Sequence, residues 1–442
     1  MDQQLPIVAL PPLPNVLSSI PLTIKPHLLL LALLLHRESA ACTFFKLTVD
    51  GHTMVGNNED AWSIDPRIWF ENGKSGEYGA VYLGQNNSTP QGGMNEAGLM
   101  FDGLKSPAKS FAGTPGKPPI RFDDLARRVL RTCATIREAE SLIRTFDFNQ
   151  LNGAYLILVD RNGEYLVVEA DTLFTGNESS YAVTNFCVST CTDFDSVPSE
   201  RYQRGRALLA ASPDTSLAFC TSVVNGMHAC RKKLGEGTLY SNILDPQRGL
   251  VHLYFYHDYT HLRTFHLKDE LAQGDHSLDM IALFPANAEF AKLVAYRTPF
   301  HSSVLFGSLL FAAAVALLFG AFAGISILSW SIARLRGRKI ERPVLPLLVG
   351  TVCSLIVLFL VPALLTNQGV FYFGLGDATE RIHPALKYLP MLLGVLVASL
   401  ALLTFREWRS HASSMPTRWT MTVHTAALFG LMIGLFYWDL VV

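Results

Sequence analysis

Hydrophobic and polar positions divide the chain into two regions with different patterns. From residue 42 to about residue 300, short apolar runs alternate with turn dipeptides, as in a soluble domain of mixed structure. Four long apolar runs follow, at about 303–330, 343–365, 386–404 and 420–440. Each is near or above the roughly 20 residues that a helix needs to cross the hydrocarbon of a bilayer. The pattern predicts one domain over 42–300 and four transmembrane helices over 301–442.

Turn dipeptides inside the first region predict antiparallel hairpins. Asp50-Gly51 separates FFKLTV from HTMVG, and Asn162-Gly163 separates AYLILV from EYLVVEA. Both dipeptides favour two-residue type I′ loops, and a third hairpin is expected between YSNIL and LVHLYFY. Residues 122–146 carry apolar positions at helical spacing and predict a helical stretch that covers part of the sheet. The expected fold class is α+β.

A short apolar segment precedes the first strand. Residues 27–35, HLLLLALLL, follow Lys25 and are too short to cross a bilayer. The small residues Ser39, Ala40 and Ala41 come next, which is typical of the site where a signal peptide is cleaved. The sequence therefore predicts a signal peptide or propeptide over 1–41, and a mature chain that begins at Cys42.

Basic residues between the long apolar runs predict the topology. Five Lys or Arg residues follow the first run and three follow the third, whereas the connection after the second holds only Arg381. The positive-inside rule then places the first and third connections in the cytoplasm. We expect a multi-pass membrane protein whose 42–300 domain lies on the extracytoplasmic side, as the signal peptide also requires.

Charge and cysteine content exclude some functions. Lys and Arg total 36 and Asp and Glu total 37, so no basic field favours nucleic acid as a partner. The seven cysteines show no CxxC pair with a second such pair or with paired histidines, and no metal is expected. Cys187 with Cys191, and Cys220 with Cys230, have spacings that could close small loops in an oxidising compartment, and the sequence leaves both pairings open.

The first hairpin places a carboxylate beside Cys42. A two-residue loop at Asp50-Gly51 pairs Val49 with His52, and counting outward brings Cys42 opposite Glu59, with Asp60 adjacent. A free N-terminal cysteine has a thiol and an α-amine with a reference pKa of about 7.7–8.0, which can accept the thiol proton. Cys42 is therefore the predicted nucleophile; the alternative is an inert buried cysteine.

Several separated motifs follow one another in a distinctive order: Cys42-Thr43, Gly56-Asn57-Asn58-Glu59-Asp60-Ala61-Trp62, Gly93-Met94-Asn95-Glu96-Ala97-Gly98-Leu99, Val183-Thr184-Asn185, Pro198-Ser199-Glu200-Arg201-Tyr202 and Thr238-Leu239-Tyr240-Ser241. Over about residues 42–268 this order resembles the family of choloylglycine hydrolase and penicillin V acylase, the cysteine branch of the N-terminal-nucleophile hydrolases. The resemblance implies an αββα four-layer sandwich of two antiparallel sheets between helical layers.

The resemblance also implies roles for particular residues. Cys42 would be the nucleophile, Asp60 the carboxylate near its amine, Asn185 an oxyanion-hole amide and Arg201 a charged support of the site. Lys105 occupies the position whose backbone N–H completes the oxyanion hole.

One departure from the family concerns the polar contact with the cysteine. The bile-salt enzymes have an arginine where this chain has Asn57, so that contact is expected to differ.

The resulting expectation is a hydrolase of linear amide C–N bonds in small-molecule N-acyl substrates, without a cofactor. An acyltransferase like those that build penicillins is one alternative, since an acceptor amine or thiol can replace water. A second is a non-catalytic membrane lipoprotein or binding module with a lipidated Cys42, because Ser39-Ala40-Ala41-Cys42 resembles a lipobox without its usual leucine. The four membrane helices contact lipid and are expected to serve as an anchor rather than for transport or signalling.

Overall fold

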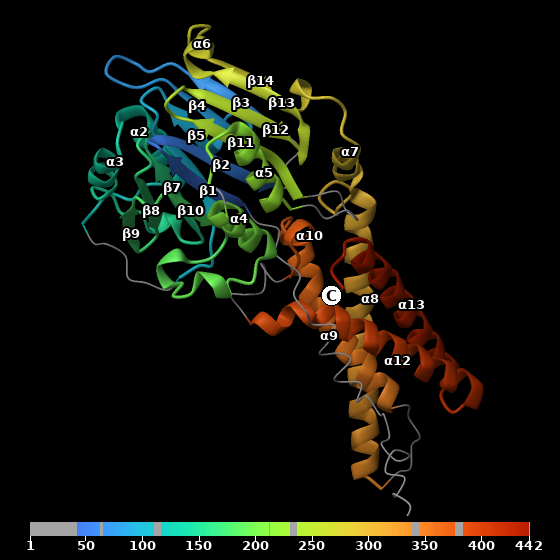
Figure 1. Ribbon diagram of the computed structural model, residues 1–442. Coiled ribbons are helices and arrows are strands. Elements are labelled where there is room, and N and C mark those ends of the chain that lie inside the picture. The colour runs from blue at the N-terminus through green and yellow to red at the C-terminus, as the bar shows by residue number, and fades with distance from the viewer. Residues whose placement is uncertain are drawn as a thin grey trace, which may run out of the picture. The chain divides into compact units, whose positions relative to one another are not determined.

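The computed structural model describes residues 42–61, 65–109, 116–211, 213–229, 237–337, 344–375 and 383–441. The predicted signal peptide and Cys230 lie outside these ranges. Within them the chain is a mixed helix and sheet structure that continues into four long apolar helices (Figure 1). The expected α+β composition is therefore confirmed.

The first sheet contains six antiparallel strands in the order β10-β1-β2-β11-β12-β13. Its central strands β1 and β2 come from the first hairpin, and β11 adds to β2 from a distant part of the chain. The strands are β1 (Thr43–Val49), β2 (His52–Ala61), β10 (Ser180–Val183), β11 (Gly237–Asp245), β12 (Leu250–Phe255) and β13 (Asp258–His266).

The second sheet contains eight antiparallel strands in the order β14-β3-β4-β5-β6-β7-β8-β9. Seven of them are consecutive in sequence, and β14 joins the edge beside β3. The strands are β3 (Pro66–Glu71), β4 (Ala80–Gln85), β5 (Thr89–Asn95), β6 (Met100–Lys105), β7 (Ala154–Val159), β8 (Tyr165–Glu169), β9 (Thr172–Gly176) and β14 (His276–Asp279).

The first hairpin has the predicted register. Val49 pairs with His52 and Thr43 with Asn58, and Asp50 and Gly51 have φ angles of 50° and 77°. Positive φ at both positions is what a type I′ loop requires. The predicted YSNIL and LVHLYFY hairpin is also present, with Asp245 paired to Leu250.

The prediction of a two-residue loop at Asn162-Gly163 was wrong. The β7–β8 ladder ends at the pair Val159 and Tyr165, so five residues separate the strands. The Asp160 carboxylate accepts hydrogen bonds from the backbone N–H groups of Asn162 and Glu164, and Gly163 alone has the positive φ, 84°. The aspartate side chain thus stabilises a longer turn than the dipeptide indicated.

The helical stretch predicted over 122–146 is two helices, α2 (Phe122–Thr132) and α3 (Ile136–Ile143). Thr135 caps α3 by accepting the N–H of Glu138, whose carboxylate accepts the N–H of Ala134. Asn95 donates to the carbonyls of Leu130 and Cys133 at the end of α2. The helical spacing of apolar residues continues across the break between α2 and α3. Only the capping hydrogen bonds show where one helix ends and the next begins.

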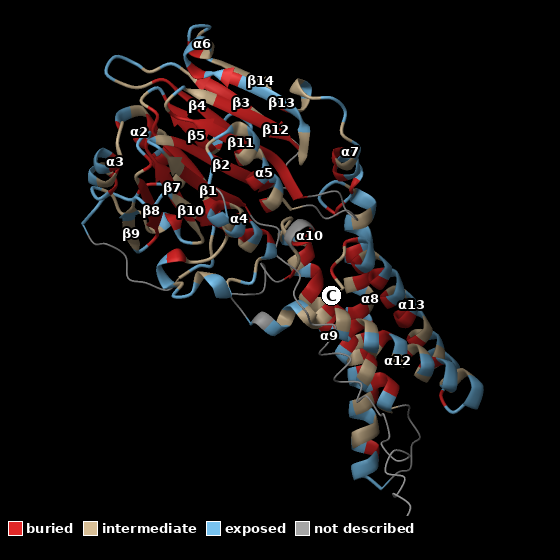
Figure 2. Ribbon diagram, in the orientation of Figure 1, coloured by how far each residue is buried: buried red, intermediate tan, exposed pale blue. Residues whose placement is uncertain are grey.

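The strands of both sheets are largely buried (Figure 2). Their buried side chains form separate clusters on the faces of the sheets. α2 and α3 pack on one face of the eight-stranded sheet, and α4 (Glu200–Ala211) and α5 (Leu217–Met227) pack on one face of the six-stranded sheet. A third cluster joins residues from the remaining faces of both sheets, including Phe44, Val55, Val81 and Ile157. We call this the inter-sheet cluster. Shorter helices are α6 (Leu267–Leu271), α7 (Ala288–Ala295) and α10 (Val370–Phe373).

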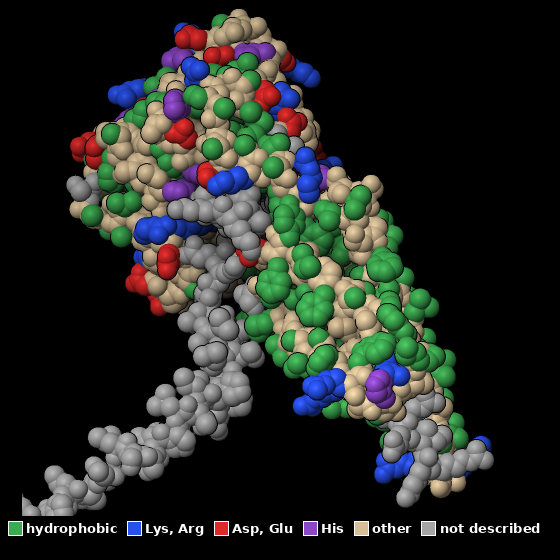
Figure 3. All heavy atoms as spheres, turned by 90° about the vertical axis from the view of Figure 1, so that its right-hand side faces the viewer, with side chains coloured by type: hydrophobic (Ala, Val, Ile, Leu, Met, Phe, Trp, Pro, Cys, Tyr) green, Lys and Arg blue, Asp and Glu red, His purple; other side chains and the backbone are tan. Residues whose placement is uncertain are grey.

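Among the described residues, four helices are long and apolar enough to cross a membrane, as predicted. They are α8 (Ser303–Leu335), α9 (Val344–Thr366), α12 (Leu389–Ser410) and α13 (Met415–Tyr437). Hydrophobic side chains cover their outer surface, and basic side chains gather at one end (Figure 3). An exposed apolar surface of this extent is stable against lipid rather than water, so the chain has the character of a membrane protein.

Candidate active site

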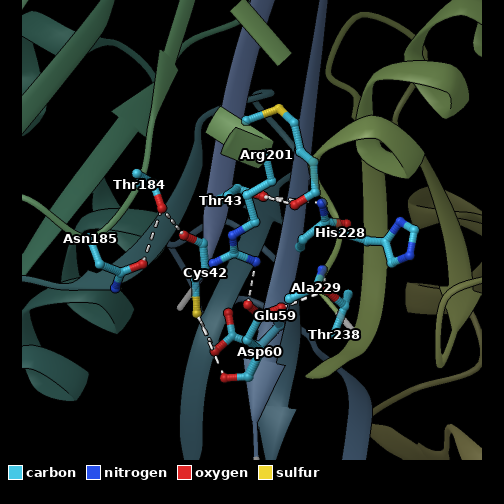
Figure 4. Close-up of polar contacts among 12 residues, drawn as sticks. Cys42, Thr43, Glu59, Asp60, Thr184, Asn185, Arg201, His228, Ala229 and Thr238 are labelled. Carbon is cyan, nitrogen blue, oxygen red and sulfur yellow. Dashed lines mark hydrogen bonds and ion pairs between the residues drawn. The ribbon is translucent and has the colours of Figure 1, made fainter. Parts of the chain in front are cut away.

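Cys42 lies just before β1 and is 7% exposed. Its carbonyl oxygen accepts a hydrogen bond of 2.9 Å from the Thr184 hydroxyl, and its Sγ donates to Glu59 Oε1 at 3.3 Å. Figure 4 shows Cys42 between these two partners, with its sulfur directed toward Glu59. The thiol is thus held by β2, and the backbone of Cys42 by the segment after β10.

Strand alternation separates the two carboxylates beside Cys42. Successive side chains of a strand point to opposite faces. Phe44 and Val55 belong to the inter-sheet cluster, whereas Phe45 and Met54 pack toward α4 and α5. Because Glu59 follows Val55 by four residues, it shares the inter-sheet face with Cys42, and Asp60 points to the helical side.

Asp60 is held in a buried ion pair with Arg201 at the start of α4. Its Oδ2 accepts from Arg201 Nη1 at 2.5 Å, and its Oδ1 accepts from the Thr238 hydroxyl at 2.6 Å. The β11 register shifts between Thr238 and Tyr240, opposite Asp60 and Glu59. Such a bulge re-aims side chains beside functional sites. Here it allows Thr238 to reach Asp60 while Tyr240 pairs with Glu59.

The predicted oxyanion residues lie side by side. Asn185 Nδ2 donates to the carbonyl of Lys105 at 2.8 Å, and its Oδ1 accepts from the Thr184 hydroxyl at 3.4 Å. Lys105 ends β6, where its backbone pairs with Ala154, and its side chain is exposed. Thr184 links this pair to Cys42 through its hydrogen bond to the cysteine carbonyl.

Two buried carboxyl groups lie on the inter-sheet face near the thiol. Glu59 accepts a hydrogen bond from Gln91 of β5, and Asp102 of β6 accepts one from Asn57 of β2. Asn57, the position at which a different polar contact was expected, therefore contacts Asp102. Burial raises the pKa of Glu59 well above its ordinary value, and the charge of Asp102 raises it further. Burial likewise raises the pKa of Asp102.

The electrostatic setting of the thiol follows from this arrangement. Burial raises the pKa of Cys42 well above its ordinary value, and Glu59, Asp60 and Asp102 add to the rise in that order. A thiol next to acidic groups stays protonated until a base accepts its proton or a positive charge enters the site. An α-amine created at Cys42 would supply both.

The structure brings Cys42, Asp60 and Arg201 into one set of contacts, and joins Asn185 and Lys105 to it through Thr184. The roles assigned to these five residues stay predictions. Sequence reasoning placed Glu59 opposite Cys42 but did not assign it a role. The alternation of side chains along β2 could have shown that Glu59 shares a face with Cys42. Asp102 and Gln91 come from the other sheet, and no local pattern places them near Cys42.

The cysteines do not form the short-loop disulfide that their spacing allowed. Cys187 Sγ donates to the carbonyl of Pro107 and Cys191 Sγ to that of Asp193. The Cys220 thiol is buried, and Cys230 lies outside the described residues. Among the described residues, no group of three His, Cys, Asp or Glu side chains is placed to hold a metal ion.

Two enzymes are among the solved structures that are similar to this chain. A mutant of the conjugated bile acid hydrolase from Clostridium perfringens matches with a TM-score of 0.42 and 16% sequence identity, over 56% of this chain and 97% of that one. Penicillin V acylase from Agrobacterium tumefaciens matches with a TM-score of 0.44 and 17% identity, over 54% of this chain and 91% of that one.

No protein-family model matches the chain, and no curated protein matches it in sequence. The two solved structures are of the kinds that the sequence motifs resemble.

Proposed function

We propose that this protein is a membrane-anchored hydrolase of linear amide C–N bonds in small N-acyl substrates, with Cys42 as an N-terminal nucleophile. One observation carries the proposal: residues from separate sequence motifs converge on one buried thiol. Glu59 and Thr184 each form a hydrogen bond with Cys42, and Asn185 forms one with Thr184. Arg201 pairs with Asp60 on the opposite face of β2. We assign the two sheets and their covering helices to the αββα sandwich of N-terminal-nucleophile hydrolases.

The proposed reaction begins after cleavage of the Ala41–Cys42 bond. The Cys42 sulfur attacks the substrate carbonyl carbon, and the α-amine of the same residue takes the thiol proton. The C–N bond then breaks, and the proton leaves with the amine product. Water attacks the resulting thioester, with the α-amine again as base, and this step releases a carboxylic acid and restores the thiol.

The oxyanion formed in both steps needs hydrogen-bond donors. Asn185 Nδ2 carries two N–H groups, and one already donates to the Lys105 carbonyl. The second N–H and the backbone N–H of Lys105 are the proposed donors. Arg201 supports the site through its ion pair with Asp60, which keeps the end of β2 in position beside Cys42.

The chain is proposed to consist of a cleaved segment over 1–41, a catalytic domain over 42–300 and an anchor over 301–442. The catalytic domain then lies on the extracytoplasmic side. A membrane anchor holds the site close to lipophilic N-acyl compounds.

The test is N-terminal sequencing and intact mass of the membrane-purified protein, with labelling by an acyl-electrophile probe. We expect a chain that begins at Cys42, and Cys42→Ser should lose labelling and at least about 10³-fold of the amide hydrolysis rate measured on N-acyl amides of graded length. Cys191→Ser, which changes a thiol outside the site, is the matched control and should behave as wild type. An uncleaved or lipidated Cys42 would refute the proposal.

Dependence on an acceptor separates hydrolysis from acyl transfer. In the proposed hydrolase, the carboxylic acid forms at the same rate with or without an added amine. Formation of a new amide that grows with the concentration of the amine would instead identify an acyltransferase.

A further inference from the structure

Glu59 carries a buried oxygen that no described residue hydrogen-bonds. Its Oε1 accepts hydrogen bonds from the Cys42 thiol and from Gln91, while Oε2 has no partner within the described residues. The residue is 3% exposed. A buried carboxyl oxygen without a partner is costly and needs an explanation. Because Oε1 of the same carboxyl group bonds the Cys42 thiol, Oε2 lies near this residue. We therefore look for a hydrogen-bond donor that Cys42 gains only in the mature protein.

Asp60, the residue assigned to the amine by family resemblance, is already engaged. Its two side-chain oxygens accept from Arg201 and Thr238. These partners lie on the helical side of β2, away from the face that Cys42 shares with Glu59. A buried aspartate that balances an arginine has little remaining capacity to bind a second cation.

The α-amine of mature Cys42 lies within reach of Glu59. The nitrogen and the sulfur of one cysteine are attached to adjacent carbons, so staggered rotamers hold them roughly 3–4 Å apart. Glu59 Oε1 is 3.3 Å from that sulfur. Before cleavage the nitrogen belongs to an uncharged amide, and after cleavage it becomes an amine that is largely protonated near neutral pH.

The charges around Glu59 favour a cation. The charged groups that act on it most strongly are Asp102 of β6 and Asp60 of β2, both acidic. Arg201 of α4 is paired with Asp60. The remaining contacts are the thiol of Cys42 and the neutral amide of Gln91, which Tyr240 of β11 also contacts. An ammonium group would balance this acidic site.

We propose that the Glu59 carboxylate binds the α-ammonium group of mature Cys42 and thereby positions the amine that serves as base for the thiol. This inference rests on the proposed function, because it requires cleavage before Cys42. Glu59 is a positioning residue: it orients the amine and does not touch the substrate. Of the two neighbouring carboxyl groups, Asp102 stays protonated, and Glu59 becomes a carboxylate because the new ammonium group stabilises its negative charge.

The consequence can be measured on the amine itself. An opposite charge nearby stabilises the ammonium form, so the pKa of the Cys42 amine should lie above the ordinary 7.7–8.0 of an α-amine. Glu59→Gln keeps the shape of the side chain and removes the charge. The pKa of the amine should then fall by about one unit.

The experiment is competitive acetylation of the α-amine across pH in the full-length mature protein, with thiols reversibly blocked as methyl disulfides. Modification of Cys42 is quantified by peptide mass spectrometry. Relative to wild type, the midpoint should fall by about one pH unit in Glu59→Gln, and Glu59→Asp, which keeps the charge, should restore most of it. Glu71→Gln removes a carboxylate of β3 that pairs with Arg127 and Arg131 of α2, and the midpoint of this variant should stay at the wild-type value.

Two outcomes would overturn the proposal while leaving the proposed function intact. One is a mature protein whose midpoint is unchanged in Glu59→Gln. The other is an Asp60→Asn variant whose midpoint falls as far as, or further than, that of Glu59→Gln, which assigns the amine to Asp60. The same samples also test the proposed function, because mass spectrometry shows where the chain begins. If no chain begins at Cys42, the proposed function itself is refuted.

Discussion

Asp102 is a buried carboxyl group near Cys42 whose ionisation destabilises the folded protein. It is 3% exposed, and its described side-chain partner is the amide of Asn57 rather than a cation. Burial raises its pKa in the folded protein above the ordinary value of 3.8. A carboxyl that favours the protonated form when folded contributes its stability below the unfolded pKa, and this contribution is lost as pH rises toward the folded pKa.

Asp102→Asn should therefore stabilise the protein at pH 8 and have little effect at pH 4. Asparagine is shaped like the protonated acid, does not titrate and can still accept from Asn57. We expect the melting temperature at pH 8 to rise by about 2–4 °C for each kcal/mol gained, measured by thermal unfolding in detergent. Asp269→Asn, a change at an exposed carboxylate on α6, is the control and should leave the melting temperature unchanged at both pH 8 and pH 4. A lower melting temperature for Asp102→Asn at pH 8 would contradict this interpretation.

At the scale of single elements, short-range caps decide where helices end. α2 and α3 are separated by three residues, although apolar periodicity continues across them. Thr135 and Glu138 satisfy backbone N–H groups at the start of α3, and Asn95 satisfies carbonyl groups at the end of α2. α3 packs on the face of the eight-stranded sheet that is opposite to the inter-sheet cluster. Its stability and the chemistry of the site should therefore be separable.

Thr135→Ala should destabilise the fold without altering the reaction. Loss of an N-cap costs about 1 kcal/mol, which corresponds to a fall of roughly 2–4 °C in melting temperature. The rate of amide hydrolysis at 25 °C should match that of wild type. Ser141→Ala removes a hydroxyl that bonds only to the carbonyl of Arg137 on the exposed side of α3, so its melting temperature should barely change. An equal fall in both variants would show that the cap is not the cause.

At the scale of the whole molecule, the distribution of charge over the apolar helices predicts the orientation in the membrane. Arg334 and Arg336 lie at the end of α8, Arg409 at the end of α12 and Arg418 near the start of α13. Basic residues at membrane boundaries are retained in the cytoplasm. The opposite ends of these helices, and the domain that precedes α8, are then extracytoplasmic.

Labelling with a membrane-impermeant maleimide tests this orientation. In a chain with Cys42, Cys187, Cys191 and Cys230 changed to serine, Lys74→Cys places an exposed thiol in the catalytic domain and Arg336→Cys places one after α8. Intact cells should label the Lys74→Cys protein, whereas the Arg336→Cys protein should react only after the membrane is permeabilised. The reverse pattern would place the catalytic domain in the cytoplasm and exclude the signal-peptide interpretation.

Local patterns in the sequence determined the four apolar helices, the register of the first hairpin and the position of Cys42 opposite Glu59. Each depends on chain length, hydrophobicity or the geometry of one short turn, which are properties of neighbouring residues. The five-residue turn at Asp160 and the break between α2 and α3 were missed because they depend on side chains that bond to particular backbone groups.

Only the tertiary structure decided which groups share the face of the thiol. Asp102 and Gln91 reach the site from the eight-stranded sheet, and Arg201 approaches Asp60 from α4 on the other side of β2. Sequence resemblance assigned both the thiol and Asp60 to one site but could not show that Asp60 is already neutralised and that Glu59 faces the sulfur. Period-two alternation fixes opposite faces within a strand, whereas the packing of two sheets decides what each face meets.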